Sequence, residues 1–215
     1  NALAISLISL FKAGDRIATD PYTYPNFIGL ASFLHIQLVA VECDADGMKP
    51  EALDSLCRTS AVRGVYLMPS CSNPMDIVMP MERREQLAEV IRRHRLTLLE
   101  DDAYAFLLPA SYKPIAALLP EQTVYICGTS KSLCAGLRVA FLAFPDACRP
   151  YLAGGVYTIN LKTVSLNAAI IAELIRSGQA EEILEIKRGL ARERNRIFRE
   201  IFGQADPETR IDSYF

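Results

Sequence analysis

Apolar and amphipathic segments alternate along this chain. Short apolar runs bounded by turn residues predict buried strands, whereas apolar positions at helical spacing predict amphipathic helices. The apolar runs place strands at residues 16–19, 37–43, 64–68, 96–99, 124–127 and 139–144. The helical segments lie at residues 2–12, 26–35, 50–57, 81–94, 114–119, about 160–177 and about 180–202. Strands that alternate with helices indicate an α/β fold, a three-layer α/β/α arrangement around a mostly parallel mixed sheet.

Polar segments follow three of the predicted strands, at residues 70–73, 100–104 and 128–138. In parallel sheets of this kind, ligands bind beyond the carboxyl ends of the strands. We therefore expect the three loops to lie on the same edge of the sheet and to form one composite site.

The third of these loops contains a lysine, Lys131, between two serine hydroxyls. A lysine is rarely buried without a partner, and a neutral lysine amine can attack a carbonyl and form a Schiff base. Arg138, with nearby hydroxyl and backbone N–H donors such as those of Ser130, suits a phosphate. An aldehyde that carries a phosphate describes pyridoxal phosphate. The alternative interpretation is a surface lysine at a strand-to-helix turn.

A carboxylate, Asp101, ends a strand whose preceding residues are apolar, and a carboxylate in such a place needs a partner. The nitrogen of a pyridine ring is a suitable partner, because a protonated ring can act as an electron sink. Spacing alone leaves open whether Glu100, Asp101 or Asp102 turns inward, but strand alternation places Asp101 opposite to both neighbours. A charged strand end in solvent is the alternative.

Four further side chains are candidates for contact with such a cofactor. Tyr104 can present its hydroxyl, and Asn73 its amide, to the ring oxygen, and these hydrogen bonds would stabilise the ionised oxygen. Tyr24 or Tyr22 can stack on the ring face. Taken by itself, Asn73 is better explained by ordinary Asn-Pro turn chemistry, and packing of a loop tyrosine is the alternative for Tyr24 or Tyr22.

Composition and charge narrow the function classes. The chain has 215 residues, of which 51% are apolar, and its net charge is −2. It has no long basic block, which argues against non-specific nucleic-acid binding by this chain. It also has no apolar run of the roughly 18 residues that a membrane helix needs, and no signal-peptide pattern.

The cysteines and histidines do not form a metal-binding pattern. The six cysteines form no Cys-x-x-Cys pair, and the two histidines lie far apart, so a zinc site is not expected. We expect a cytoplasmic protein with reduced thiols. The chain lacks an initial Met and begins inside an apolar segment, which predicts a fragment with an incomplete large domain at residues 1–203 and the start of a second at 204–215.

Four motifs in order resemble the class I/II aminotransferases of pyridoxal-phosphate fold type I, from residue 1 to about residue 202. They are Asn73-Pro74, Asp101-Asp-Ala-Tyr104, Ser130-Lys131 and Gly136-Leu-Arg138. The residues within and around these motifs are similar to those of the aminotransferase-like domain of MocR-type GntR regulators. These regulators also carry a winged-helix DNA-binding domain. The segments that carry this closer likeness include Tyr66-Leu-Met-Pro-Ser70, Arg83-Arg84, Glu100-Asp-Asp-Ala-Tyr104 and Ser130-Lys-Ser-Leu133.

The resemblance implies a pyridoxal 5'-phosphate cofactor and a homodimer with sites at the subunit interface. It also implies a role for each matched residue. These are a Schiff base at Lys131, the ring-nitrogen partner Asp101, ring-oxygen contacts from Asn73 and Tyr104, phosphate contacts from Ser130 and Arg138, and an aromatic contact from Tyr24.

This sequence departs from the family pattern at several positions. Met75-Asp76 replaces the usual Thr-Gly, and Gly128 stands where the family has a hydroxyl. Ala135 and Ala140 replace a proline and a glycine. The Gly-rich phosphate loop and the C-terminal small domain with its carboxylate-binding arginine are not in this sequence. These departures predict weak cofactor retention or none, and no turnover, by this chain alone, and the changed residues favour a sensor.

Three functional hypotheses follow. The first is the effector-sensing and dimerisation domain of a MocR/GntR-type regulator, in which the cofactor or its adduct with a small amino compound changes the domain. The second is a free-standing aminotransferase that moves an amino group between an amino acid and a 2-oxo acid, with Lys131 as the proton carrier. The third is a phosphate- or nucleotide-binding α/β protein, although Lys131-Ser132 lacks the glycines of a P-loop.

Overall fold

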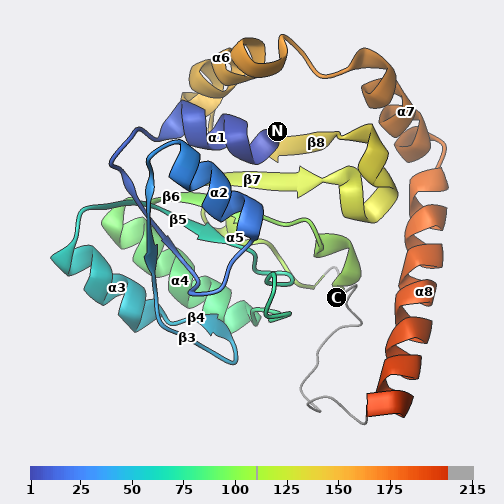
Figure 1. Cartoon of the computed structure of the whole chain (residues 1–215), viewed down its shortest axis with the longest axis horizontal. Coiled ribbons are helices and arrows are strands. Elements are labelled where there is room, and N and C mark those ends of the chain that lie inside the picture. Colours follow the sequence, from blue (N-terminus) through green and yellow to red (C-terminus); the bar gives the residue numbers. More distant parts are fainter. Residues whose placement is uncertain (110, 203–215) are drawn as a thin grey trace.

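The computed structural model describes residues 1–109 and 111–202, which build a twisted sheet between two layers of helices (Figure 1). Within these residues the sheet has the strand order β2-β1-β5-β6-β7-β8. The first five strands in this order run parallel, and β8 is antiparallel to β7. The predicted mostly parallel mixed sheet is therefore confirmed. Its strands are β1 Arg16–Thr19, β2 Gln37–Ala40, β5 Val62–Leu67, β6 Thr97–Asp101, β7 Thr123–Gly128 and β8 Ala140–Ala143.

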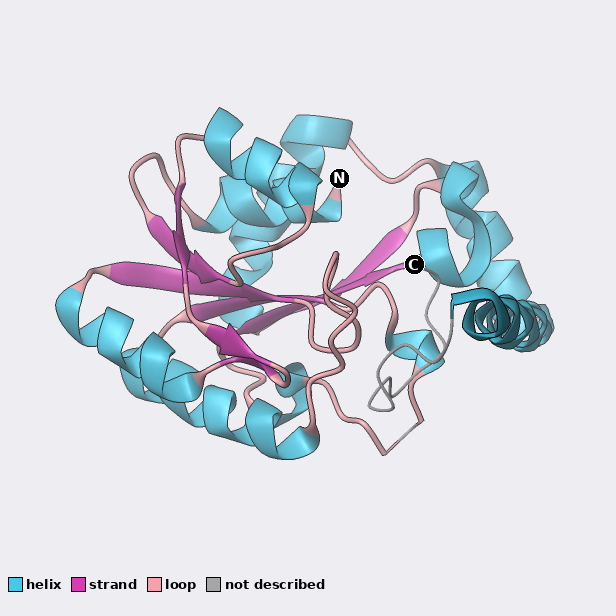
Figure 2. Ribbon diagram, turned by 60° about the horizontal axis from the view of Figure 1, so that its bottom comes forward, coloured by secondary structure: helices cyan, strands magenta, loops and turns pink. Residues whose placement is uncertain are grey.

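Helices cover both faces of the sheet, as Figure 2 shows, so the predicted three layers are confirmed. Neighbouring strand residues pack into different cores, Tyr66 on one face and Leu67 on the other. Because both faces are covered, the central strands are largely apolar, with the acids of β6 confined to its carboxyl end. One face carries α1 Ala2–Leu10, α2 Pro25–Phe33 and α6 Arg149–Asn160, and the other carries α3 Pro50–Thr59, α4 Met81–His94 and α5 Ile115–Leu118.

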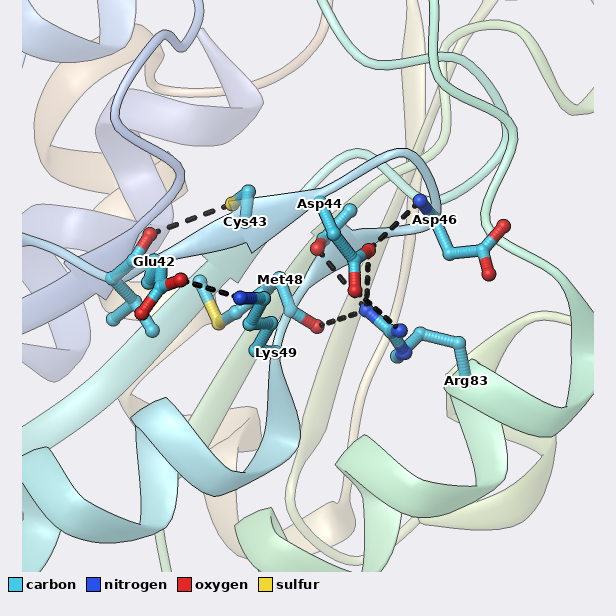
Figure 3. Close-up of polar contacts among 9 residues, drawn as sticks. Glu42, Cys43, Asp44, Asp46, Met48, Lys49 and Arg83 are labelled. Carbon is cyan, nitrogen blue, oxygen red and sulfur yellow. Dashed lines mark hydrogen bonds and ion pairs between the residues drawn. The ribbon is translucent and has the colours of Figure 1, made fainter.

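A small hairpin, β3 Cys43–Asp44 and β4 Gly47–Met48, lies beside α4 (Figure 3). Arg83 of α4 donates to both carboxylate oxygens of Asp44, each at 2.9 Å. The same guanidinium donates to the carbonyls of Gly47 and Met48, each at 3.1 Å. A planar fork of donors suits this combination of carboxylate and carbonyls, so Arg83 fixes the hairpin to the helix layer.

The C-terminal third differs from the prediction. Residues 149–160 form α6, which the sequence pattern did not predict, and the helix expected from about residue 160 begins only at Ser165. Two adjacent glycines, Gly154 and Gly155, obscure α6 because glycine is a poor helix former. Gly155 has a packing reason: a Cβ there would lie 2.2 Å from Ser9 Oγ and 3.2 Å from Ile5 Cγ2 of α1.

The remaining elements are short turns and two further helices, α7 Ser165–Arg176 and α8 Gln179–Phe202. The segment Ser130–Cys134 is a π-helical turn, which we call the lysine turn. Three short 3-10 turns are η1 Ala105–Leu107, η3 Ala135–Leu137 and η4 Asp146–Cys148. The second domain predicted to start at 204–215 lies outside the described residues. No helix in the described part of the chain is both long and apolar enough to cross a membrane.

Candidate functional site

One cavity of about 560 Å³ lies beyond the carboxyl ends of β1, β5, β6 and β7. The strand order reverses between β1 and β5, and such a reversal is where open α/β sheets bind ligands. The cavity brings together all seven residues singled out from the sequence. They are Tyr24, Asn73, Asp101, Tyr104, Ser130, Lys131 and Arg138.

Asp101 is the carboxylate that faces this cavity. It ends β6, and its Oδ2 accepts a hydrogen bond of 3.0 Å from the hydroxyl of Tyr66 on the neighbouring strand β5. Tyr66 is 1% exposed and stacks on Phe27 of α2, with ring centroids 3.8 Å apart. Burial raises the pKa of Asp101 to about 6, and the bond from Tyr66 acts in the opposite direction. The site therefore contains a buried acid whose ionised form needs a cationic partner.

The two acids beside Asp101 point elsewhere, as strand alternation predicts. Glu100 is fully buried and accepts the backbone N–H groups of Ile115 and Ala116 at 2.8 and 2.7 Å. Burial raises its pKa to about 7. Asp102 accepts a hydrogen bond of 2.9 Å from the Tyr125 hydroxyl. Neither acid lines the cavity, so the geometry resolves the choice among the three carboxylates that the spacing left open.

Lys131 and Tyr104 lie next to each other in the cavity. The Lys131 Nζ is 5.7 Å from the centroid of the Tyr104 ring. Tyr104 is 2% exposed, and burial raises the pKa of its hydroxyl. A cation over a ring face at this distance is attracted by the ring quadrupole. The arrangement places an amine and a phenol at the same wall.

The loop that carries Ser130, Lys131 and Arg138 is closed at its base. Thr129 donates to the carbonyl of Val139 from both its backbone N–H, at 3.1 Å, and its hydroxyl, at 2.8 Å. This double contact brings the two ends of the loop together, so that residues eight apart in sequence line the same cavity. Arg138 has a left-handed backbone, with a φ of 55°. The loop thus presents a hydroxyl, an amine and a guanidinium from one short segment.

The loop that carries Asn73 is held by a buried arginine. Arg84 of α4 is fully buried and donates to the carbonyls of Pro69 and Met79, at 2.9 and 3.0 Å. These two carbonyls lie at the two ends of the loop. Within it, Asp76 stands in a left-handed conformation with a φ of 57°, which aspartate tolerates better than most residues. The departure from Gly at this position is therefore compatible with the turn.

Tyr24 lines the cavity, whereas Tyr22 does not and is 67% exposed. Of the two tyrosines that the sequence left open, Tyr24 is therefore the one at the cavity, and its contact with a ring stays a prediction. It precedes Pro25, the first residue of α2, and its hydroxyl accepts a hydrogen bond of 2.9 Å from the Asn26 amide.

Two parts of the site were not predicted from the sequence. Tyr66 could have been found, because a phenol inside a buried strand needs a hydrogen-bond partner. The second part is a wall formed by α6 and the segment between α6 and α7, which no pattern indicated because α6 itself was not predicted. Its lining residues are Val156, Asn160, Lys162, Thr163 and Val164.

The fold and the cavity together define the class: the sheet is that of the pyridoxal-phosphate-dependent transferases of fold type I. The family model described as aminotransferase class I and II matches residues 1–209. The chain therefore belongs to the class I and II aminotransferase family, whose cofactor is pyridoxal 5'-phosphate.

Relatives include both regulators and enzymes. The chain is 34% identical over 197 residues to the HTH-type transcriptional regulator YdeF of Bacillus subtilis, covering 92% of this chain and 43% of that protein. It is 28% identical over 174 residues to the 2-aminoadipate transaminase of Thermus thermophilus, covering 76% of this chain and 44% of the enzyme. The chain thus spans less than half the length of these relatives.

Solved structures of aminotransferases superpose on this chain. The α-aminoadipate aminotransferase LysN of Thermus thermophilus, complexed with N-(5'-phosphopyridoxyl)-L-leucine, superposes with a TM-score of 0.80 at 27% identity. The match covers 89% of this chain and 51% of LysN. The kynurenine aminotransferase of Pyrococcus horikoshii superposes with a TM-score of 0.86 at 24% identity, over 96% of this chain and 53% of that one, and supports the fold.

Proposed function

We propose that this chain is a pyridoxal-phosphate-binding aminotransferase-type domain in which Lys131 forms the Schiff base with the cofactor. The single observation that carries the proposal is the shared cavity of Lys131, Asp101 and Arg138. Asp101 comes from the end of β6, whereas Lys131 and Arg138 come from the closed loop that follows β7. An amine, a buried acid and a guanidinium are the three groups that an aldehyde, a pyridine nitrogen and a phosphate require.

The residues present fit this cofactor on the chemistry of the donor set. Asp101 is buried, its pKa is raised to about 6 by that burial, and a cationic ring nitrogen would offset the cost of its charge. Arg138 and Ser130 would hold the phosphate, while Asn73 and Tyr104 would contact the ring oxygen. Tyr24 would pack on the ring face. When bound, the cofactor supplies an aldehyde that condenses with amines and a ring that accepts electrons.

The chain's own residues have distinct parts in this proposal. Lys131 supplies the amine and, once released by an incoming amino compound, is placed to carry a proton at its Nζ. Tyr66 donates to Asp101 and orients its carboxylate towards the cavity. Tyr104 packs its ring beside the Lys131 amine and restricts where that amine can lie.

We further propose that the domain senses a small amino compound and dimerises within a MocR/GntR-type regulator. The similarity to YdeF over 92% of this chain supports this role, as do the substitutions at Met75, Asp76 and Gly128. The alternative is a free-standing aminotransferase acting on an amino acid and a 2-oxo acid, and the similarity to the Thermus transaminase favours it.

A homodimer is part of the same proposal. Tyr157, Leu161 and Leu166, around the segment between α6 and α7, are 68%, 69% and 69% exposed. Large exposed apolar side chains that gather in one region mark interaction surfaces. The same segment lines the cavity, so a partner subunit packed on it would lie close to the site.

A cofactor titration tests the binding proposal. Pyridoxal phosphate added to the full-length protein should give a new absorption band above 400 nm that saturates with one cofactor per chain, at roughly micromolar affinity. Lys131→Ala should remove the band, whereas Lys113→Ala, at an exposed lysine outside the cavity, should leave it intact. An unchanged band in Lys131→Ala would reject the assignment.

A second experiment separates the regulator from the enzyme. The full-length protein with bound cofactor is incubated with single amino acids and 2-oxo acids, and amino-group transfer is measured. A regulator should show turnover at least about a thousandfold below ordinary enzymes, whose rate constants are about 10 per second, and the full-length sequence should contain a helix-turn-helix. Turnover near that ordinary rate would favour the enzyme.

A further inference from the structure

Helix α8 contacts the lysine turn through one side chain. The ammonium of Lys187 donates to the carbonyl of Lys131 at 2.9 Å and to the carbonyl of Leu133 at 2.6 Å. These carbonyls belong to a π-helical turn, whose wide winding leaves main-chain acceptors for a partner from outside. Burial lowers the pKa of Lys187, because desolvation disfavours the charged ammonium. The backbone of the proposed Schiff-base lysine is thus held by a residue 56 positions later in the sequence.

The next residue on α8 holds a second turn. Arg188 donates to the carbonyl of Phe106 from Nε at 2.9 Å and from Nη2 at 2.6 Å. Its remaining nitrogen, Nη1, donates to Glu181 at 3.1 Å and pairs with Glu185, both on the same helix. The guanidinium is therefore oriented by its own helix while it grips the 3-10 turn η1 that directly follows Tyr104.

The lysine turn and the residue just before η1 contribute neighbouring side chains to one cavity wall. Lys131 and Tyr104 both line the cavity, with the amine 5.7 Å from the phenol ring. Figure 1 shows α8 as a long helix at the side of the molecule, next to the turn that follows β7. One helix thus holds, through two consecutive residues, the main chain beneath both groups.

We propose that Lys187 and Arg188 are positioning residues that couple α8 to the site. A shift of α8 moves the lysine turn and η1 and so changes how Lys131 meets Tyr104. Coupling between two sites is reciprocal, so filling the cavity must also restrain α8. The inference rests on the proposed function. In a sensor domain, α8 would be the element that transmits to the rest of the protein whether the cavity is filled.

The test uses the full-length protein and four variants. Lys187→Met and Arg188→Met remove the donors, Lys187→Arg keeps a donor, and Arg192→Met, at an exposed cation on the same helix, is the matched control. Hydrogen exchange of the amides at residues 130–134 is measured without cofactor, together with the thermal unfolding midpoint. Pyridoxal phosphate is then titrated, and the exchange of α8 is followed before and after saturation.

We expect Lys187→Met to speed exchange in the lysine turn about tenfold and to weaken cofactor binding by about tenfold, because the ammonium that donates to two carbonyls of this turn is lost. Arg188→Met should weaken binding similarly, and both variants should abolish the slowing of α8 exchange that the cofactor causes in the unmodified protein. Lys187→Arg should restore most of both effects, and Arg192→Met should show neither.

The coupling is rejected if Lys187→Met keeps normal exchange in residues 130–134, or if it binds the cofactor and slows α8 exchange to the same extent as the unmodified protein. A uniform fall in the unfolding midpoint with unchanged local exchange also rejects it, because that outcome describes a structural residue only. Failure of the unmodified protein to bind pyridoxal phosphate rejects the proposed function instead. The exchange measurement without cofactor then still decides whether Lys187 holds the turn.

Discussion

Three consecutive acids at the end of β6 have three different environments, and only one faces the cavity. Glu100 is held by two backbone N–H groups and Asp102 by the Tyr125 hydroxyl, whereas Asp101 has the hydroxyl of Tyr66 and borders the cavity. Burial raises the pKa of Asp101 to about 6 from an ordinary value of 3.8. A carboxyl with a higher pKa in the folded state binds protons more tightly there, so its ionisation destabilises the cofactor-free fold.

The Asp101→Asn variant should therefore be more stable than the unmodified protein when no cofactor is present. The pKa difference makes the unmodified protein lose stability as the pH rises from about 4 to about 6, while the amide does not titrate. The gain in unfolding free energy should be about 1 kcal/mol larger at pH 8 than at pH 5. Urea unfolding at the two pH values measures it.

An exposed acid provides the control for this measurement. Glu121→Gln, at an exposed carboxylate, should change stability by the same small amount at pH 5 and pH 8. A gain for Asp101→Asn that is equal at both pH values, or larger at pH 5, would contradict the raised pKa. The same variant should lose tight cofactor binding, because an amide cannot balance a protonated ring nitrogen.

At the scale of elements, α6 is the helix that the sequence pattern failed to predict. Its adjacent glycines resemble a break in a helix, yet Gly155 is buried where α6 packs on α1 and Gly154 is exposed with no atom near a Cβ. The close approach of the two helices therefore depends on one of the glycines and not on its neighbour.

Two alanine substitutions in α6 test this difference. Gly154→Ala should stabilise the protein by about 0.5–1 kcal/mol, because alanine is the better helix former and meets no obstacle. Gly155→Ala should instead destabilise it by about 1–2 kcal/mol, because the new methyl group must displace Ser9 and Ile5. Chemical denaturation of both variants gives the two signs. Equal gains in stability would contradict this prediction, because they would show that α1 and α6 can accommodate the new methyl group without loss of stability.

What the sequence could and could not predict follows from the range of the interactions. Buried strands such as β6 and β7 were predictable because each contains a continuous apolar run, and the motifs at their ends placed Asp101 and Lys131 on one edge. The contact of Tyr66 with Asp101 joins residues 35 apart, and that of Lys187 with Lys131 joins residues 56 apart. Nothing local in the sequence encodes such pairs, so they required the structure.

At the scale of the whole molecule, four parallel strands deliver their loops to one edge of the sheet. β1 leads to Tyr24, β5 to Asn73, β6 to Asp101 and β7 to Lys131, and all four side chains reach the same cavity. This cavity lies at the point where the strand order reverses, between β1 and β5. The fold thus assembles one composite site from segments that no single motif defines.

The measurement that tests this account most directly is a covalent map of the cofactor. The full-length protein is saturated with pyridoxal phosphate, reduced with borohydride and digested, and the modified lysine is identified by mass spectrometry. The account predicts one label per chain, on Lys131. Lys162 also lines the cavity, so a label there, on any lysine outside the cavity, or on none, would contradict the assignment.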